Sequence, residues 1–170
     1  MDFTKIIRTI PDFPEKGIMF RDTTTLFQDG EAFSAAIDTI CEHLEGIEFD
    51  LVAGPEARGF VFGAPVACKL KKGFITARKK GKLPYKTLSK SYDLEYGSAT
   101  LEIHADAVKK GQKVVIVDDL LATGGTCKAL CELIEECGAE VAAIFFFIEL
   151  EDLKGREVLK GYNIISQITY

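Results

Sequence analysis

The chain has 170 residues, of which 47% are hydrophobic, and a formal net charge of −5. This length fits one globular domain with a full core, and the acidic balance argues against a nucleic-acid-binding protein. The longest apolar run, residues 141–148, is too short to span a bilayer, and the N-terminal residues lack the apolar stretch of a secretory signal. We therefore expect a cytoplasmic protein that binds no nucleic acid and no membrane.

Strands and helices alternate along the chain. Nearly continuous apolar runs predict strands that are buried on both faces, and a spacing of three to four residues predicts helices. In chain order, the pattern predicts a helix at 31–46, a strand at 49–54, a helix at 57–72, a strand at 73–78, a β-hairpin within 89–108, a strand at 113–119, a helix at 125–138 and a strand at 140–150. This order predicts an α/β fold with a Rossmann-like parallel sheet flanked by helices.

The sequence contains no internal repeat and no sign of a second domain. The segments before Glu31 and after Leu150 are too short to fold alone, so we expect them to cap one core. We therefore predict a single domain over residues 1–170.

Five cysteines are scattered through the sequence, at Cys41, Cys68, Cys127, Cys131 and Cys137. Their number is odd, and neither histidine is close to them in sequence. This pattern favours reduced thiols over a disulfide or a metal site.

The segment VVIVDDLLATGGT, residues 114–126, joins a predicted buried strand to a predicted helix. Ligands of open parallel sheets bind beyond the carboxyl ends of the strands. There, Asp118 and Asp119 can accept hydrogen bonds from the vicinal hydroxyls of a sugar. The small residues that follow allow backbone N–H groups to surround a phosphate at the start of the helix, and two of them add hydroxyl donors. These predicted phosphate-binding residues are Ala122, Thr123, Gly124, Gly125 and Thr126.

The alternative is a glycine-rich turn in which Asp119 caps the helix. The whole segment, however, resembles the phosphoribosyl diphosphate signature of the type I phosphoribosyltransferases. Further stretches in the same order resemble the adenine phosphoribosyltransferases, and together they cover most of the chain: residues 11–29, 53–67, 77–84, 92–108 and 153–159. Two small departures are TTTLF, where the family often has a proline, and Tyr85 after KLP.

The resemblance implies transfer of the 5-phosphoribosyl group from phosphoribosyl diphosphate to adenine, giving AMP and diphosphate, as in purine salvage. It also implies Mg²⁺, a homodimer, a small N-terminal hood at residues 1–30 and a flexible β-hairpin lid at 79–97. We expect Mg²⁺ to be held through the substrate and water, without direct protein ligands, because this ion keeps several waters.

Basic residues are predicted to bind the diphosphate. Arg58 follows a buried strand and can form a bidentate contact, although an arginine at a helix start can also be merely exposed. The resemblance implies a cis peptide bond between Ala57 and Arg58 that directs N–H groups at the diphosphate. Residues 78–90 hold six of the 21 basic residues and no acidic one, and within them Arg78 and Lys82 are the preferred ligands.

The base-binding residues depend on the resemblance. Phe20 is expected to stack on adenine, although it could equally be one of 12 core phenylalanines. The backbone of Met19 and Arg21 is expected to read the base edge. The family places a carboxylate near the base at Glu95, which we expect to act as the acid/base together with catalytic Arg58, unless it is a surface glutamate on the hairpin.

Two other functions remain open at this point. One is a phosphoribosyltransferase for a 6-oxopurine. The other is a non-catalytic sensor of phosphoribosyl diphosphate, which would normally carry a DNA-binding segment. A base-dependent assay of diphosphate release distinguishes these functions.

Overall fold

The computed structural model describes residues 1–93 and 97–170. These residues form two units, Met1–His43 and Leu44–Tyr170, each of which is described by itself. Within the described residues, no helix has the length and apolar character needed to cross a bilayer.

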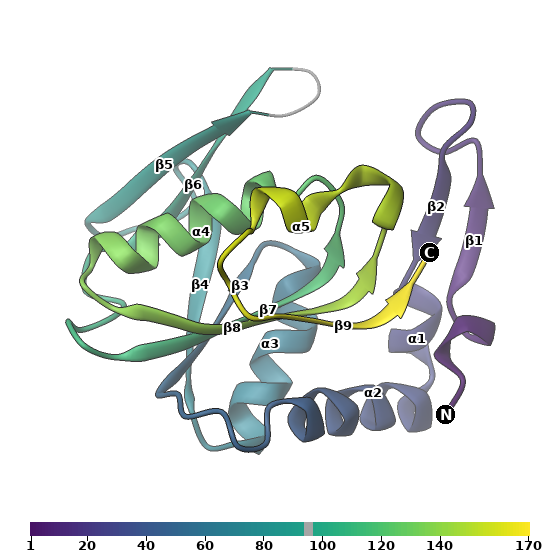
Figure 1. Ribbon diagram of the computed structural model, residues 1–170, viewed down its shortest axis with the longest axis horizontal. Coiled ribbons are helices and arrows are strands. Elements are labelled where there is room, and N and C mark those ends of the chain that lie inside the picture. The colour runs from purple at the N-terminus through teal and green to yellow at the C-terminus, as the bar shows by residue number, and fades with distance from the viewer. Residues whose placement is uncertain (94–96) are drawn as a thin grey trace. The chain divides into compact units, whose positions relative to one another are not determined.

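A seven-stranded sheet forms the centre of the second unit, in the order β5-β6-β4-β3-β7-β8-β9 (Figure 1). Five neighbouring strands run parallel to one another, in the order β4-β3-β7-β8-β9, whereas β6 is antiparallel to both β4 and β5. The strands are β3 (Leu51–Pro55), β4 (Gly73–Lys79), β5 (Thr87–Asp93), β6 (Ser98–His104), β7 (Lys113–Leu121), β8 (Glu140–Glu149) and β9 (Ile164–Thr169).

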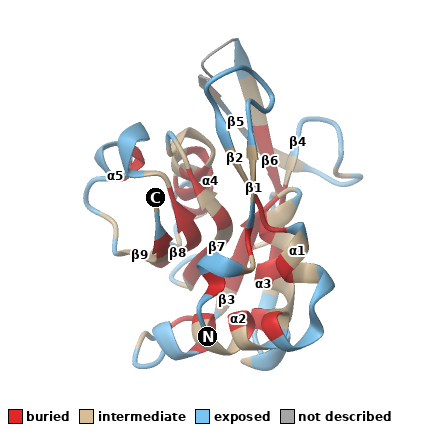
Figure 2. Ribbon diagram, turned by 90° about the vertical axis from the view of Figure 1, so that its right-hand side faces the viewer, coloured by how far each residue is buried: buried red, intermediate tan, exposed pale blue. Residues whose placement is uncertain are grey.

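Helices cover both faces of this sheet. Helix α3 (Arg58–Lys69) lies on one face, and α4 (Gly125–Glu136) lies on the other together with the short α5 (Gly155–Val158), which follows η2 (Glu151–Leu153) (Figure 1). The central strands β7 and β8 are therefore buried on both sides (Figure 2). On the α3 face the rings of Phe62 and Phe147 stack with centroids 4.8 Å apart. On the α4 face Ile116 and Leu130 belong to one fully buried cluster. Burial of each such side chain contributes about 1.5–3 kcal/mol, so packing on both faces stabilises the position of β7 in the sheet.

The first unit begins with a β-hairpin and continues with two helices. Its elements are η1 (Phe3–Lys5), β1 (Arg8–Pro11), β2 (Met19–Asp22), α1 (Thr24–Gln28) and α2 (Gly30–His43). Strands β1 and β2 pair antiparallel in a two-stranded sheet. The Asp22 carboxylate accepts hydrogen bonds from Arg8 (2.5 Å) and from the backbone and hydroxyl of Thr24. These bonds, chiefly the one from Arg8, lower the pKa of Asp22 to about 2.

The predicted fold class is confirmed, and each predicted strand and helix is present with ends shifted by a few residues. The hairpin at Gly97 is also confirmed, as β5 and β6. The C-terminal tail does more than cap the core, because residues 164–169 add the edge strand β9. Its sequence, IISQIT, lacks a continuous apolar run because an edge strand is less buried than a central one. The single domain with segment boundaries at 1–30 and 79–97 stays a prediction.

Candidate functional site

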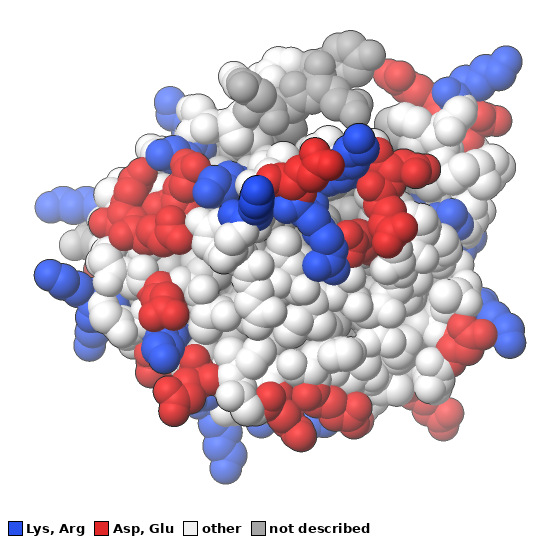
Figure 3. Space-filling model, in the orientation of Figure 1, with Lys and Arg blue, Asp and Glu red and all other residues white. Residues whose placement is uncertain are grey.

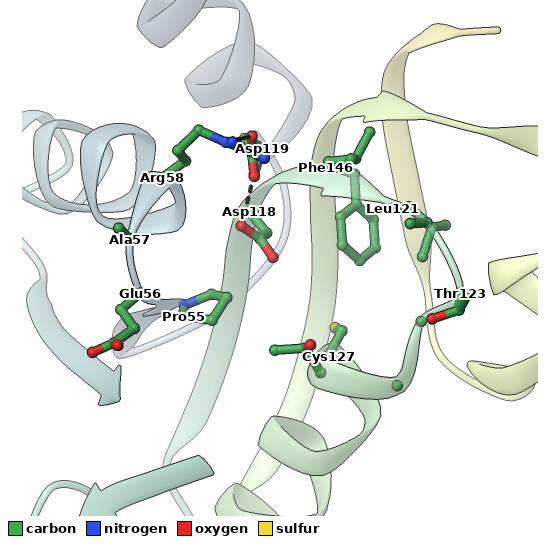
Figure 4. Close-up of a pocket in the computed structure, with 15 residues that line it drawn as sticks. Pro55, Glu56, Ala57, Arg58, Asp118, Asp119, Leu121, Thr123, Cys127 and Phe146 are labelled. Carbon is green, nitrogen blue, oxygen red and sulfur yellow. Dashed lines mark hydrogen bonds and ion pairs between the residues drawn. The ribbon is translucent and has the colours of Figure 1, made fainter. Parts of the chain in front are cut away.

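A pocket with a volume of about 340 Å³ opens at the carboxyl ends of β3 and β7 (Figure 4). Its wall comes from the ends of these two strands, from the loop and helix start that follow each of them, and from one residue of β8. The lining residues are Pro55, Glu56, Ala57, Arg58, Asp118, Asp119, Leu120, Leu121, Ala122, Thr123, Gly124, Gly125, Thr126, Cys127 and Phe146. The structure therefore brings the predicted ribose, phosphate and Arg58 positions together in one cavity.

The two carboxylates of β7 have different partners. The Asp119 carboxylate forms an ion pair with Nε of Arg58, and its side chain is only 8% exposed. The backbone N–H of Asp119 donates to Oδ1 of Asp118 at 2.8 Å (Figure 4). Asp119 thus points to the start of α3, and the alternative in which it caps α4 is wrong.

Asp118 is in an environment that disfavours its charge. Burial raises the pKa of Asp118 well above its usual value, and the negative charge of Asp119 raises it further. Arg58 acts in the opposite direction but does not cancel these effects. A ligand that donates hydrogen bonds or brings positive charge to this carboxylate would therefore favour its ionised form.

The residues Ala122–Thr126, here called the phosphate loop, lead directly into α4. Gly124 is the residue before the helix and has φ of +83°, a left-handed conformation that glycine adopts without strain. No side chain caps the helix. The first N–H groups of a helix have no intrahelical acceptor, so this loop presents donors and a favourable dipole to an anion.

Ala57 and Arg58 form the opposite side of the pocket, after β3. A cis peptide bond is present, but it joins Glu56 to Ala57, so its predicted position between Ala57 and Arg58 is wrong. The N–H of Glu56 still donates to the Ala77 carbonyl of β4 at 2.9 Å. This bond links the first residue after β3 to the neighbouring strand β4.

Arg78 and Lys82 do not line the pocket. The Arg78 guanidinium donates to Oε2 of Glu56 at 2.8 Å and to the Lys82 carbonyl at 3.3 Å. Glu56 itself lines the pocket, so Arg78 contacts a pocket residue without lining the pocket. Lys82 is exposed. Diphosphate binding by these two residues stays a prediction.

Sequence reasoning missed the residues that hold the basic segment in place. Glu102 on β6 is 6% exposed and accepts a hydrogen bond from the Gly81 N–H at 3.0 Å. Lys90 lies between Glu132 (3.0 Å) and Glu136 (3.1 Å) of α4. Figure 3 shows acidic and basic side chains interleaved over the face that carries α4 and α5. The spacing of the two glutamates, one helical turn apart, is the only sequence signal that could have suggested the Lys90 pairing.

Sequence reasoning also missed six residues that line the pocket: Pro55, Glu56, Leu120, Leu121, Cys127 and Phe146. Cys127 directly follows the phosphate loop, and its hydrogen bond with Cys131, followed by burial, raises the pKa of its thiol well above the usual value. Phe146 lies on β8 opposite Asp118, a pairing that no local sequence pattern reveals. All five cysteines are free thiols in the structure. Within residues 1–93 and 97–170, no three His, Cys, Asp or Glu side chains gather as metal ligands would.

The predicted base-binding residues lie on β2 of the first unit. Met19 is half exposed, and the Phe20 ring contacts Phe13 edge-on with centroids 5.1 Å apart. The Arg21 guanidinium donates to the Thr9 hydroxyl. The predicted acid/base Glu95 lies outside the described residues.

Comparison with known proteins identifies the family. The model of the phosphoribosyl transferase domain matches residues 23–166. An adenine phosphoribosyltransferase from Thermosipho africanus is 58% identical over 168 residues, which cover 99% of each chain. The chain belongs to the adenine phosphoribosyltransferase family.

Solved adenine phosphoribosyltransferases share the fold. The enzyme from Thermoanaerobacter pseudethanolicus is 55% identical and superposes with a TM-score of 0.97, covering 99% of this chain and 98% of the other. The Saccharomyces cerevisiae enzyme, solved in complex with an imino-altritol bisphosphate and adenine, is 37% identical with a TM-score of 0.94, covering 98% and 96%. The family resemblance inferred from the sequence motifs is therefore confirmed.

Proposed function

We propose that this chain transfers the 5-phosphoribosyl group from phosphoribosyl diphosphate to adenine, giving AMP and diphosphate in purine salvage. The observation that carries the proposal is the pocket, in which paired carboxylates, a phosphate loop and an arginine surround one cavity. Membership of the adenine phosphoribosyltransferase family supports the choice of base.

The ribose 5-phosphate part of the substrate fits the β7 side of the pocket. The N–H groups of the phosphate loop and the hydroxyls of Thr123 and Thr126 would bind the 5-phosphate. Asp118 and Asp119 would accept hydrogen bonds from the ribose hydroxyls. Such bonds stabilise the ionised form of Asp118, whose negative charge then lies close to the sugar ring as it becomes cationic.

Arg58 changes partner in this proposal. In the structure its guanidinium is paired with Asp119. Diphosphate offers a more highly charged bidentate partner, and the ribose hydroxyls offer Asp119 new donors. Substrate binding would thus replace the ion pair between Arg58 and Asp119 by contacts of Arg58 with diphosphate and of Asp119 with ribose. Arg58 would then stabilise the negative charge of the departing diphosphate, with Arg78 and Lys82 contributing from the lid.

Mg²⁺ fits the oxygen-rich character of this site. Asp118 and Asp119 would hold the ion through substrate hydroxyls and water, because Mg²⁺ prefers oxygen ligands and keeps part of its hydration shell. When bound, the ion neutralises charge on the diphosphate.

Adenine recognition is assigned to β2. Phe20 would stack on the base, an interaction worth about 1–3 kcal/mol. Met19 and Arg21 are two residues apart on a strand, so their backbone carbonyl and N–H groups point to the same edge. A carbonyl acceptor and an N–H donor match the N6 amine and N1 of adenine. A 6-oxopurine presents the opposite pattern, so buried groups would stay unpaired at a cost of about 1–3 kcal/mol each.

Proton transfer completes the proposed reaction. The N9 proton of adenine must leave as the new bond to the anomeric carbon forms, and Glu95 is the predicted acceptor. Closure of the lid would exclude water, which would otherwise compete with adenine for the activated ribose. A homodimer and a cytoplasmic location stay predictions.

An assay of diphosphate release with separate bases tests the function. We expect release that depends on adenine, with kcat/KM for adenine far above the values for hypoxanthine and guanine, by up to roughly 10⁴-fold. A hypoxanthine value within about tenfold of adenine would favour the 6-oxopurine enzyme. Binding of phosphoribosyl diphosphate without any base-dependent release would favour the non-catalytic sensor.

A further inference from the structure

The phosphate loop is supported from behind by α5. A Cβ atom added at Gly155 would lie 2.4 Å from the carbonyl oxygen of Ala122 and 2.6 Å from Cδ1 of Leu121. In the reverse direction, a Cβ added at Gly124 would lie 2.8 Å from the carbonyl oxygen of Gly155. Backbone therefore touches backbone on both sides of this contact, and the position of Gly155 limits where the phosphate loop can lie.

Helix α5 cannot keep this position by itself. It has only four residues, Gly155–Val158, and a single helical turn is unstable in isolation. Arg156 connects it to the sheet, since its Nε and Nη2 atoms donate to the two carboxylate oxygens of Glu149, each at 2.7 Å. The same guanidinium donates to the Ser166 hydroxyl at 2.8 Å and to the Ile164 carbonyl at 3.2 Å.

The acceptor of this ion pair, Glu149, lies at the end of β8, beside the end of β7 that precedes the phosphate loop. Glu149 is 5% exposed and lies opposite Leu121, the last residue of β7. The next residue, Leu150, donates its N–H to the Leu121 carbonyl at 2.9 Å. Hydrogen bonds from Arg156 hold the pKa of Glu149 below its usual value, so the pair is charged at neutral pH.

We propose that Arg156 and Glu149 are positioning residues for the 5-phosphate. Through Gly155 they hold the phosphate loop in the conformation that directs its N–H groups into the pocket. Neither residue lines the pocket, so the proposed role acts through the loop and not through a direct contact. This inference rests on the proposed function, in which the loop binds the 5-phosphate of phosphoribosyl diphosphate.

Arg156→Gln tests the proposal, because it keeps most of the side-chain stem but removes the bidentate ion pair. We expect KM for phosphoribosyl diphosphate to rise by about tenfold or more while KM for adenine changes by less than about twofold. Arg156→Lys, which keeps the charge but not the fork of donors, should give an intermediate value. Gly155→Ala, which displaces the loop directly, should give the same selective change.

Tyr162→Phe is the matched control. Its hydroxyl donates to Glu135 at 2.9 Å and accepts from Lys128 at 3.5 Å, so this variant also loses hydrogen bonds of the C-terminal segment to α4, but none to Gly155 or the phosphate loop. We expect both KM values of this variant to equal those of the wild type.

Hydrogen exchange and ligand binding separate this proposal from the proposed function. In the ligand-free protein, peptides covering 121–127 should exchange faster in Arg156→Gln than in the wild type and in Tyr162→Phe. Calorimetry should show that Arg156→Gln binds ribose 5-phosphate more weakly than the wild type and Tyr162→Phe do. Neither hydrogen exchange nor calorimetry needs turnover. If the wild type failed to use adenine, the proposed function would be contradicted, but these two measurements would still test the role of Arg156.

Unchanged exchange and unchanged KM for phosphoribosyl diphosphate in Arg156→Gln would overturn the proposal. An equal rise of both KM values would also overturn it, since that outcome indicates general destabilisation. If Arg156→Gln does not fold, Arg156→Lys and Gly155→Ala carry the same comparison.

Discussion

The end of β7 and the basic segment 78–90 differ in how their side chains relate to the pocket. From Asp118 to Thr126, every residue lines one cavity. In the basic segment, by contrast, Arg78 is paired with Glu56 and Lys90 with two glutamates of α4. No residue of the basic segment lines the cavity.

The difference follows from what positions each region. The end of β7 continues a strand that is buried on both faces and passes directly into a helix, so the local sequence predicts which of its residues reach the cavity. The basic segment connects an inner strand to an edge hairpin and is held by carboxylates from distant parts of the chain, such as Glu102. A sequence motif predicts site residues well where they follow one another in a short segment. It predicts them poorly where long side chains bind partners that are distant in sequence.

The largest loss of activity is expected from substitutions at the end of β7. Replacing both Asp118 and Asp119 by asparagine should lower kcat/KM by about 100-fold or more, because the ribose loses both charged acceptors. Circular dichroism should show an unchanged fold. Asp50→Asn is the control, because Asp50 accepts a hydrogen bond from the Lys113 N–H at the opposite end of the sheet. Near-normal activity in the double variant would refute the sugar-binding role.

Arg78 and Lys90 should differ although both are basic and lie in the same segment. Arg78→Gln should lower kcat/KM by about tenfold, since it loses the contact to the pocket residue Glu56 and a predicted diphosphate ligand. Lys90→Gln should change kcat/KM by less than about twofold, because surface ion pairs such as those with Glu132 contribute little. Steady-state kinetics with phosphoribosyl diphosphate as the varied substrate compare the two. Equal losses would show that net positive charge, rather than position, matters here.

Proteolysis measures whether the basic segment closes over the ligand. Lys79, Lys80, Lys82 and Lys86 are exposed, so trypsin should cut this segment in the free enzyme. Phosphoribosyl diphosphate with Mg²⁺ should slow the cut by several-fold, because closure lowers the population that the protease can bind. Gel analysis of the fragments over time gives the two rates. The same rate with and without ligand would contradict closure.

The smallest expected effect concerns the stability of the strand end. The pKa of Asp118 is raised in the folded state, chiefly by burial, so the folded protein binds a proton that the unfolded chain has released. As pH rises from about 4, where an unfolded aspartate ionises, through the raised folded pKa, the stability contributed by this proton is lost. Asp118→Asn should therefore stabilise the ligand-free protein by about 1 kcal/mol at the upper end of this range, while lowering its activity.

Urea unfolding of the wild type and Asp118→Asn at several pH values measures this difference. The gain should shrink as pH falls toward 4, where the wild-type carboxyl is protonated in both states. Asp50→Asn again serves as the control and should show no such gain. A gain that does not depend on pH would mean that ionisation of Asp118 is not its cause.

The sequence alone determined the parallel sheet and the ribose and phosphate side of the site. Continuous apolar runs identify strands buried on both faces, and the Asp118–Thr126 stretch carries its carboxylates, small residues and helix start within one local segment. Only the tertiary structure decided that Asp119 pairs with Arg58, that Phe146 lies beside Asp118, and that Gly155 supports the phosphate loop. The same holds for the cis bond at Glu56–Ala57, which lies next to a hydrogen bond from Glu56 to β4. These features join residues far apart in the chain, and no local periodicity or motif encodes which distant partner a side chain meets when the sheet assembles.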